Sequence, residues 1–168
     1  MQRGPRWSWP TSTTGLARYS KRHRAREWVL RALYAREMDP EAAEPLDVLL
    51  EADPPREIDR GFARRLYDVV CRDTSRYDEL IESKLENWDL SRLALLDLLL
   101  LRMALAEFEH FPDVPERVTL NEVIELAKRY SGAQAGSFVN GVLDVLRPGA
   151  ARGHLPGKTP PDAGSRNA

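Results

Sequence analysis

Cysteine is almost absent from the sequence, and its scarcity limits both how the chain can be stabilised and what chemistry it can perform. The 168 residues contain one cysteine, Cys71, which excludes an internal disulfide framework and fits a reducing cytoplasmic compartment. Cys71 lies in an apolar helical pattern, so we interpret it as a core residue and not as a nucleophile. Aromatic residues make up only 8% of the chain, which favours helices packed through Leu, Ala and Val.

Long hydrophobic runs and clustered catalytic groups are also missing. The longest apolar stretch, Leu93 to Leu101, is interrupted by Asp97 and is too short to span a bilayer. The N-terminus lacks the apolar segment of a secretory signal. None of the histidines stands at metal-ligand spacing from another His or Cys: these are His23, His110 and His154. The sequence therefore predicts no catalytic constellation, no metal site and no cofactor.

Helical periodicity accounts for the sequence between residues 20 and 147, and no stretch alternates like a half-buried strand. The predicted helices cover residues 21–38, a short stretch from Pro45, then 58–69, 75–88, 90–108, 117–132 and 136–146. Segment 90–108 is apolar almost all round, as is typical of a central buried helix. We therefore predict an all-α fold of about seven helices in two small packed bundles, divided near Asp73.

The two ends of the chain differ in composition from this helical part. Residues 1–19 and 148–168 are rich in Pro, Gly, Ser and Thr and have no periodicity, so we expect disordered extensions on either side of a domain at 20–147. Deletion of most of both ends should leave the melting temperature nearly unchanged, because neither segment can bury much apolar area.

Positive charge gathers at the N-terminal end of the chain. Residues 1–36 contain nine Lys/Arg and one acid, whereas the remainder contains sixteen Lys/Arg and twenty-five acids. Lys21, Arg22, Arg24 and Arg26 occupy the start of the first predicted helix, where each cation costs roughly 0.3–1 kcal/mol against the helix dipole. Replacing Arg24 and Arg26 should therefore not destabilise the fold. A helical stripe continues away from the apolar face through Arg24, Glu27, Arg31 and Tyr34.

This basic helix start predicts a polyanion partner. Free N–H groups and arginine side chains at a helix N-terminus form an anion site, and the planar guanidinium suits phosphates and bases. Nucleic acid is the polyanion we favour, with Arg31 as a further contact. The alternative is an ordinary solvated basic face.

Four stretches of the sequence resemble the successive signatures of the NusB family. They are "RHRAREWVLRALY", "NWDLSRLALLDLLLLRMALAEF", "DVPERVTLNEVIELAKRYSG" and "SFVNGVLD", in the family's order and over roughly residues 20–147. The resemblance implies an all-helical fold of two small bundles and no catalytic activity. It further implies binding of boxA RNA together with NusE, a small-subunit ribosomal protein, in RNA polymerase antitermination complexes on ribosomal RNA operons.

The resemblance also carries site residues onto this chain. Positions that match the family's RNA-binding stretch or a region near the RNA are Lys21, Arg22, Arg24, Arg26, Phe138 and Asn140. Positions associated with the RNA and NusE surface are Tyr34 and Asp97. The sequence departs from the family at His23, where an arginine is common, and in "GAQAGSF", which lacks the charges that relatives often have there.

Two alternative functions stay open at this point. A NusB-like module also forms the RNA-binding part of a ribosomal RNA methyltransferase, which implies a role in rRNA methylation or ribosome maturation. A helical scaffold without nucleic acid is the other possibility, and RNA binding that weakens steeply with salt would exclude it.

A glycine inside the last predicted helix needs its own explanation. Gly141 costs about 1 kcal/mol against Ala on helix propensity alone. We therefore expect that Gly141 permits close helix packing and that a methyl group at this position clashes.

Overall fold

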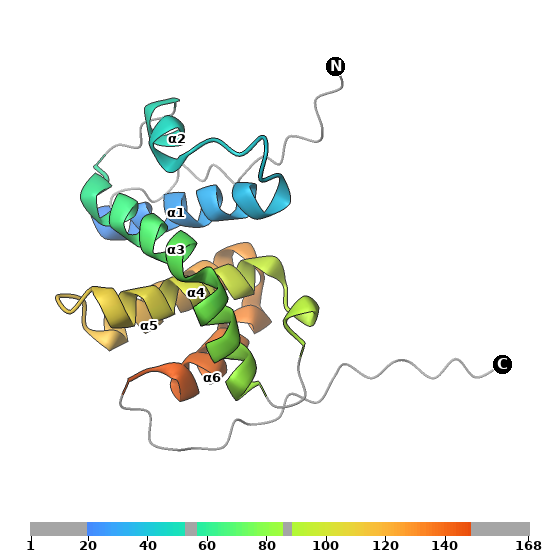
Figure 1. Ribbon diagram of the computed structural model, residues 1–168. Helices are drawn as coiled ribbons and strands as arrows, with labels where there is room; N and C mark the ends of the chain where they lie inside the picture. Colours follow the sequence, from blue (N-terminus) through green and yellow to red (C-terminus); the bar gives the residue numbers. More distant parts are fainter. Residues whose placement is uncertain (1–19, 53–56, 86–88, 149–168) are drawn as a thin grey trace.

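The computed structural model describes residues 20–52, 57–85 and 89–148, and this part of the chain is all-α without a strand. Six α-helices and one short 3-10 helix follow one another (Figure 1): α1 Lys21–Met38, α2 Leu46–Ala52, α3 Arg60–Lys84, η1 Leu90–Arg92, α4 Leu95–His110, α5 Glu116–Tyr130 and α6 Ala133–Leu146. The all-α prediction is confirmed, with six α-helices in place of about seven. The extensions expected at 1–19 and 148–168 lie outside the described residues, apart from Pro148.

A kink in α3 explains the difference in helix number. The sequence suggested two helices separated near Asp73, but α3 continues through this residue, whose backbone leaves helical geometry at φ −105° and ψ 16°. The Thr74 hydroxyl donates to the Val70 carbonyl oxygen at 2.7 Å, a back-bond that bends helices. Arg72 donates two hydrogen bonds to the Asp73 carboxylate at 3.0 and 2.9 Å. The polar run around Asp73 therefore bends the helix without ending it.

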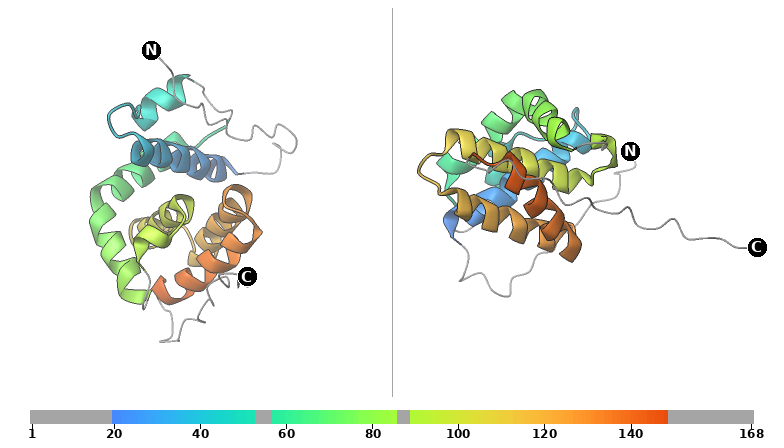
Figure 2. Two further views of the ribbon diagram at one scale, coloured as in Figure 1. Left: turned by 90° about the vertical axis from the view of Figure 1, so that its right-hand side faces the viewer. Right: turned by 90° about the horizontal axis from the view of Figure 1, so that it is seen from below.

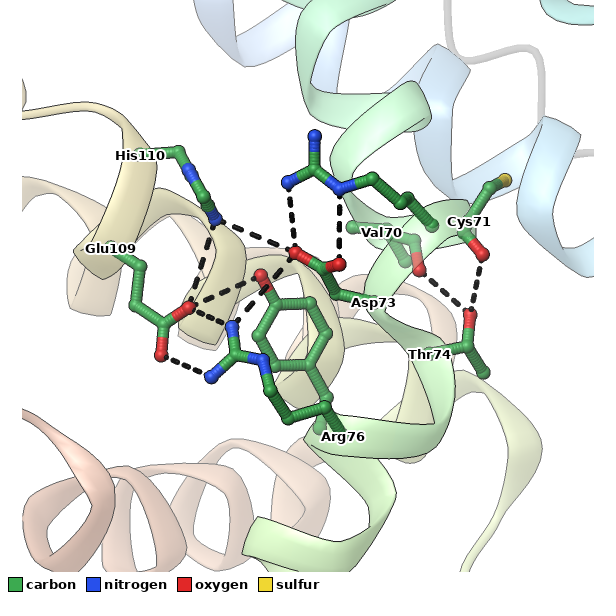
Figure 3. Close-up of polar contacts among 9 residues, drawn as sticks. Val70, Cys71, Asp73, Thr74, Arg76, Glu109 and His110 are labelled. Atoms are coloured by element: carbon green, nitrogen blue, oxygen red, sulfur yellow. Dashed lines mark hydrogen bonds and ion pairs between the residues drawn. The ribbon is translucent and has the colours of Figure 1, made fainter.

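A polar cluster fastens the kink to the C-terminal end of α4 (Figure 3). Arg76 donates to both carboxylate oxygens of Glu109, and His110 Nε2 lies 3.6 Å from the Asp73 carboxylate. The hydrogen bond from Arg76 is the main reason that the pKa of Glu109 lies below its usual value. The two halves of α3 are thus held at a fixed angle by α4.

Helix α4 is the centre of the molecule. All eleven residues from Asp97 to Glu107 are buried, which confirms the prediction of a central helix. Helices α1, α3, α5 and α6 all pack against it. Figures 1 and 2 show α1 and α2 gathered around the first half of α3, with α4, α5 and α6 on the other side of the kink. The predicted two bundles are confirmed.

The last helix starts earlier than the predicted residue 136. Gly132 has φ +107°, a conformation that favours glycine, and α6 begins directly after it. The inward residues are Val139, Val142, Leu143 and Leu146, whereas Val145 is only partly buried.

The expectation for Gly141 is wrong. A Cβ at this position would meet no heavy atom within 4 Å, so helix packing does not require a glycine there. The tight glycine is Gly136, whose Cβ would come within 2.7 Å of the Lys128 side chain. Because the nearest atom is Lys128 Cγ, close to the helix backbone, the lysine side chain must shift to admit a methyl group at Gly136.

Candidate nucleic-acid interface

The interface suggested by the sequence begins at the N-terminus of α1. The Ser20 hydroxyl accepts a hydrogen bond from the His23 backbone N–H at 3.0 Å, which caps the helix. The first turn contains no acid. The Asp59 backbone N–H donates to the Lys21 carbonyl oxygen at 3.2 Å, so the start of α1 is joined to the start of α3. Lys21 itself is exposed.

Arg22 faces outward but is already engaged by two carboxylates. Its Nη1 lies 2.7 Å from Asp113 Oδ2, and its Nε lies 3.3 Å from Asp59 Oδ2. The guanidinium also stands 4.9 Å from the centre of the Phe62 ring, a cation–π arrangement. The hydrogen bond with Asp113 is the main cause of a raised pKa for Arg22 and of a lowered pKa for Asp113. Arg22 remains 40% exposed in its side chain.

Arg24 has a looser acidic neighbour. Its Nη1 donates to the Glu57 carbonyl oxygen at 3.3 Å and lies 3.7 Å from the Glu57 carboxylate. The Glu57 side chain is 73% exposed, so water weakens this pair strongly. The Arg24 side chain itself is only 12% exposed, so Arg24 is mostly buried although its acidic neighbour Glu57 faces water.

Arg26 points into the protein, unlike the other cations of the cluster. It is 1% exposed, and its Nε and Nη2 donate to the two carboxylate oxygens of Glu107 on α4 at 2.6 and 2.8 Å. The Thr119 hydroxyl on α5 donates to Glu107 as well, at 2.8 Å. The Arg26 guanidinium thus faces protein carboxylates, and the expectation that its replacement leaves the fold unharmed is not compatible with this burial.

His23 is the second inward residue of this turn. It is 2% exposed, and its Nδ1 lies 2.6 Å from Glu122 Oε2 on α5. Arg26 Nη1 is 3.5 Å from the same oxygen. Burial raises the pKa of Glu122, but the hydrogen bond with His23 and the charges of His23 and Arg26 outweigh it, so the net pKa is lowered. His23 therefore joins α1 to α5. Because it is buried, it is not part of the exposed basic surface.

Two further cations lie beside aromatic rings, Arg31 on α1 and Arg129 on α5. Arg31 is half-buried and stands 5.0 Å from the centre of the Trp28 ring. Glu27 accepts a hydrogen bond from the Tyr130 hydroxyl at 2.8 Å and pairs with Arg129 at 2.8 Å. Arg31 is thus part of a surface that α1 and the C-terminal end of α5 share.

The remaining candidate residues are spread over other helices. Tyr34 and Phe138 are half-buried and pack against the core. Asp97 is 8% exposed, in the first turn of α4. Asn140 on α6 donates to Asp144 at 3.4 Å. Helix α6, which carries Phe138 and Asn140, packs mainly on α5, α4 and α3.

Sequence reasoning missed the acids that accompany the cations. Asp59 and Asp113 are 37 and 91 positions from Arg22, and periodicity within one helix carries no signal for such pairs. The described residues contain no group of three His, Cys, Asp or Glu side chains that could hold a metal ion. Among the same residues, no helix is long and apolar enough to cross a membrane.

Comparison with known proteins assigns relatives to the chain. A sequence model of the NusB family matches residues 23–147. A transcription antitermination protein NusB from Salinibacter ruber is 42% identical over 132 residues, which are 76% of this chain and 81% of that protein. The protein of the same name from Geobacillus kaustophilus is 40% identical over 127 residues, covering 76% of this chain and 95% of the relative.

Solved structures give the same result. NusB from T. maritima superposes with a TM-score of 0.66 at 37% identity, covering 80% of this chain and 93% of that chain. A complex described as antitermination factors NusB and NusE with dsRNA contains a chain that matches with a TM-score of 0.66 at 26% identity. The match covers 75% of this chain and 95% of that one.

Proposed function

The chain belongs to the NusB family, and from this we infer that it is a transcription antitermination factor which binds boxA-type RNA together with NusE. The family match over residues 23–147 is the observation that carries the proposal. The similar solved complex contains both NusE and RNA, which supports the same pair of partners here. We further propose that the protein acts in the cytoplasm, within the RNA polymerase complex on ribosomal RNA operons, and that it has no catalytic activity.

The proposed RNA surface starts from the outward cations of α1. Lys21 is exposed and the Arg22 side chain is 40% exposed beside partly exposed acids, whereas Arg24 is only 12% exposed beside the exposed Glu57. Phosphate oxygens can replace such exposed carboxylates, because charge-assisted bonds between Arg and phosphate are at least as strong. Arg31, beside Trp28, would meet the strand further along the helix.

Arg26 receives a different role in this proposal. A guanidinium that is 1% exposed and doubly bonded to Glu107 cannot reach a phosphate without breaking a buried ion pair. We propose that Arg26 positions the first turns of α1 on α4 and α5, so that its neighbours are presented to RNA. Tyr34 and Asp97 are kept as proposed NusE contacts, and Phe138 and Asn140 as proposed RNA contacts on α6.

RNA binding with and without NusE tests the proposal. Affinity should be higher for a boxA-containing RNA than for a scrambled RNA of the same composition, and higher still with NusE present. Each phosphate contact to a single strand contributes a salt slope of about 0.7. Equal affinity for the two RNAs, unaffected by NusE, would exclude this function.

A matched pair of arginine variants locates the RNA surface. Arg24→Ala should flatten the salt slope by about 0.7, because one phosphate contact is lost. Arg64→Ala is the control, since Arg64 also pairs with an exposed acid, Asp47, but lies on α3 outside the proposed surface. If both variants change the slope equally, the effect comes from net charge alone.

A further inference from the structure

Two acidic side chains of the protein lie where the RNA backbone is proposed to bind. Asp113, before α5, and Asp59, before α3, both contact the guanidinium of Arg22. We call Arg22, Asp59 and Asp113 the carboxylate clamp. We propose that Asp113 is an affinity-setting residue: it occupies the outer edge of Arg22 as a built-in competitor that an RNA phosphate must displace. This inference rests on the proposed RNA-binding function.

The geometry of Arg22 is that of an anion site already filled. Its Nη1 and Nε each face a carboxylate oxygen, at 2.7 Å from Asp113 and 3.3 Å from Asp59. Planar presentation of N–H groups to anionic oxygens is also how arginine binds a phosphodiester. The Phe62 ring, 4.9 Å away, backs the guanidinium, so Arg22 is oriented before any ligand arrives. The carboxylates therefore stand in for phosphate oxygens.

The two acids of the clamp differ in what else they do. Asp59 accepts a hydrogen bond from the Phe62 backbone N–H at 3.0 Å and caps α3, so it is part of the fold. Asp113 is 55% exposed in its side chain, and among the described residues it forms an ion pair with Arg22 alone. A phosphate can thus displace Asp113 into water without disturbing either helix. Asp113 is the replaceable member of the clamp.

This arrangement has a consequence for selectivity. Phosphate contacts carry no sequence information, so displacement of Asp113 weakens binding to every RNA by the same factor. The clamp thereby keeps binding to arbitrary RNA weak and leaves discrimination to contacts elsewhere on the surface. Removal of the Asp113 charge should tighten binding to boxA and scrambled RNA equally and leave their ratio unchanged.

The test compares four full-length proteins: wild type, Asp113→Asn, Arg22→Ala and the double variant. At low salt, Asp113→Asn should bind both RNAs about two- to fivefold more tightly, as expected for the loss of one exposed competing pair. The gain should shrink as salt rises, because screening weakens the clamp. In the Arg22→Ala background the gain should fall to the level of a matched control. That control is Asp47→Asn, which removes the same charge and also breaks an exposed pair with an arginine.

Each outcome decides for or against the clamp. No gain from Asp113→Asn, weaker binding, a gain that persists without Arg22, or a gain no larger than that of Asp47→Asn would overturn it. Heparin binding by the same proteins provides a measurement that does not depend on RNA recognition. If wild type fails to bind RNA at all, the proposed function is lost. An Arg22-dependent gain for heparin then still confirms the clamp, and its absence refutes it.

Discussion

Replacement of Arg26 by alanine should destabilise the protein far more than replacement of any outward arginine of α1. Arg26 is 1% exposed, and its truncation leaves the Glu107 carboxylate buried with the Thr119 hydroxyl as its one side-chain hydrogen-bond donor among the described residues. Breaking a buried ion pair by removing one partner costs about 3–5 kcal/mol. Total stability of a domain is about 5–15 kcal/mol, so the variant should lose a large share of it.

Urea denaturation followed by circular dichroism measures this loss. With an m-value of about 2 kcal/mol per molar urea, the midpoint should fall by about 1.5–2.5 M. Arg64→Ala is the control: Arg64 and its partner Asp47 are each 51% exposed in their side chains, and exposed pairs contribute about 0–1 kcal/mol. Its midpoint should therefore move by about 0.5 M or less. An Arg26→Ala midpoint within that same small range would refute the buried pair.

A double variant separates the structural role of Arg26 from RNA contact. Arg26→Met combined with Glu107→Met removes both buried charges, and such replacements are often neutral or stabilising. The double variant should therefore recover most of the decrease in urea midpoint that is expected for Arg26→Ala. If Arg26 only positions α1, the double variant should bind RNA with the salt slope of wild type. A slope lower by about 0.7 would show instead that Arg26 touches a phosphate.

Two further predictions concern stability. Gly141→Ala should raise the free energy of unfolding by about 0.5–1 kcal/mol, because a methyl group meets no atom within 4 Å. Gly132→Ala should lower it, since Gly132 has φ +107°. If urea denaturation shows that both substitutions change the free energy of unfolding in the same direction, the argument is contradicted. Acid should weaken the fold: Glu122 and Glu109 have lowered pKa values, so their stabilisation is complete above about pH 4.5 and is lost as pH falls through their folded values. Urea midpoints from pH 7 to 3.5 should show this loss, less steeply in Glu122→Gln, and an equal slope in the variant would count against the His23–Glu122 bond.

The sequence predicts helices well where apolar periodicity is strong. Helix α1 has the predicted bounds, and the uniformly apolar segment at 90–108 contains the central α4. The kink at Asp73 was misjudged because Asp and Thr beside each other are typical both of a helix end and of a bend with side-chain back-bonding. Only the Thr74–Val70 hydrogen bond and the contacts with α4 distinguish the two cases.

The sequence identified the residues of the candidate site, but not which of their side chains point into the protein. Arg26 precedes the buried residues Val29, Leu30 and Leu33 by three, four and seven positions. This helical spacing places Arg26 on the buried face of α1. Its positive charge led us to expect an exposed side chain instead. The partners of the cations could not be predicted, because Glu107 is 81 positions from Arg26 and Asp113 is 91 from Arg22. No periodicity relates side chains that far apart.

The acids around the start of α1 explain how the helix tolerates a cationic first turn. Cations there oppose the helix dipole, yet Arg22 is compensated by Asp59 and Asp113, and Arg26 by Glu107. The Arg26–Glu107 pair is buried and holds α1 against the central helix, whereas the Arg22–Asp113 pair is exposed to water and can be exchanged. One short basic stretch therefore does two jobs, and exposure to water decides which arginine does which. The buried one holds the helix in place, and the exposed ones are available to an anionic ligand.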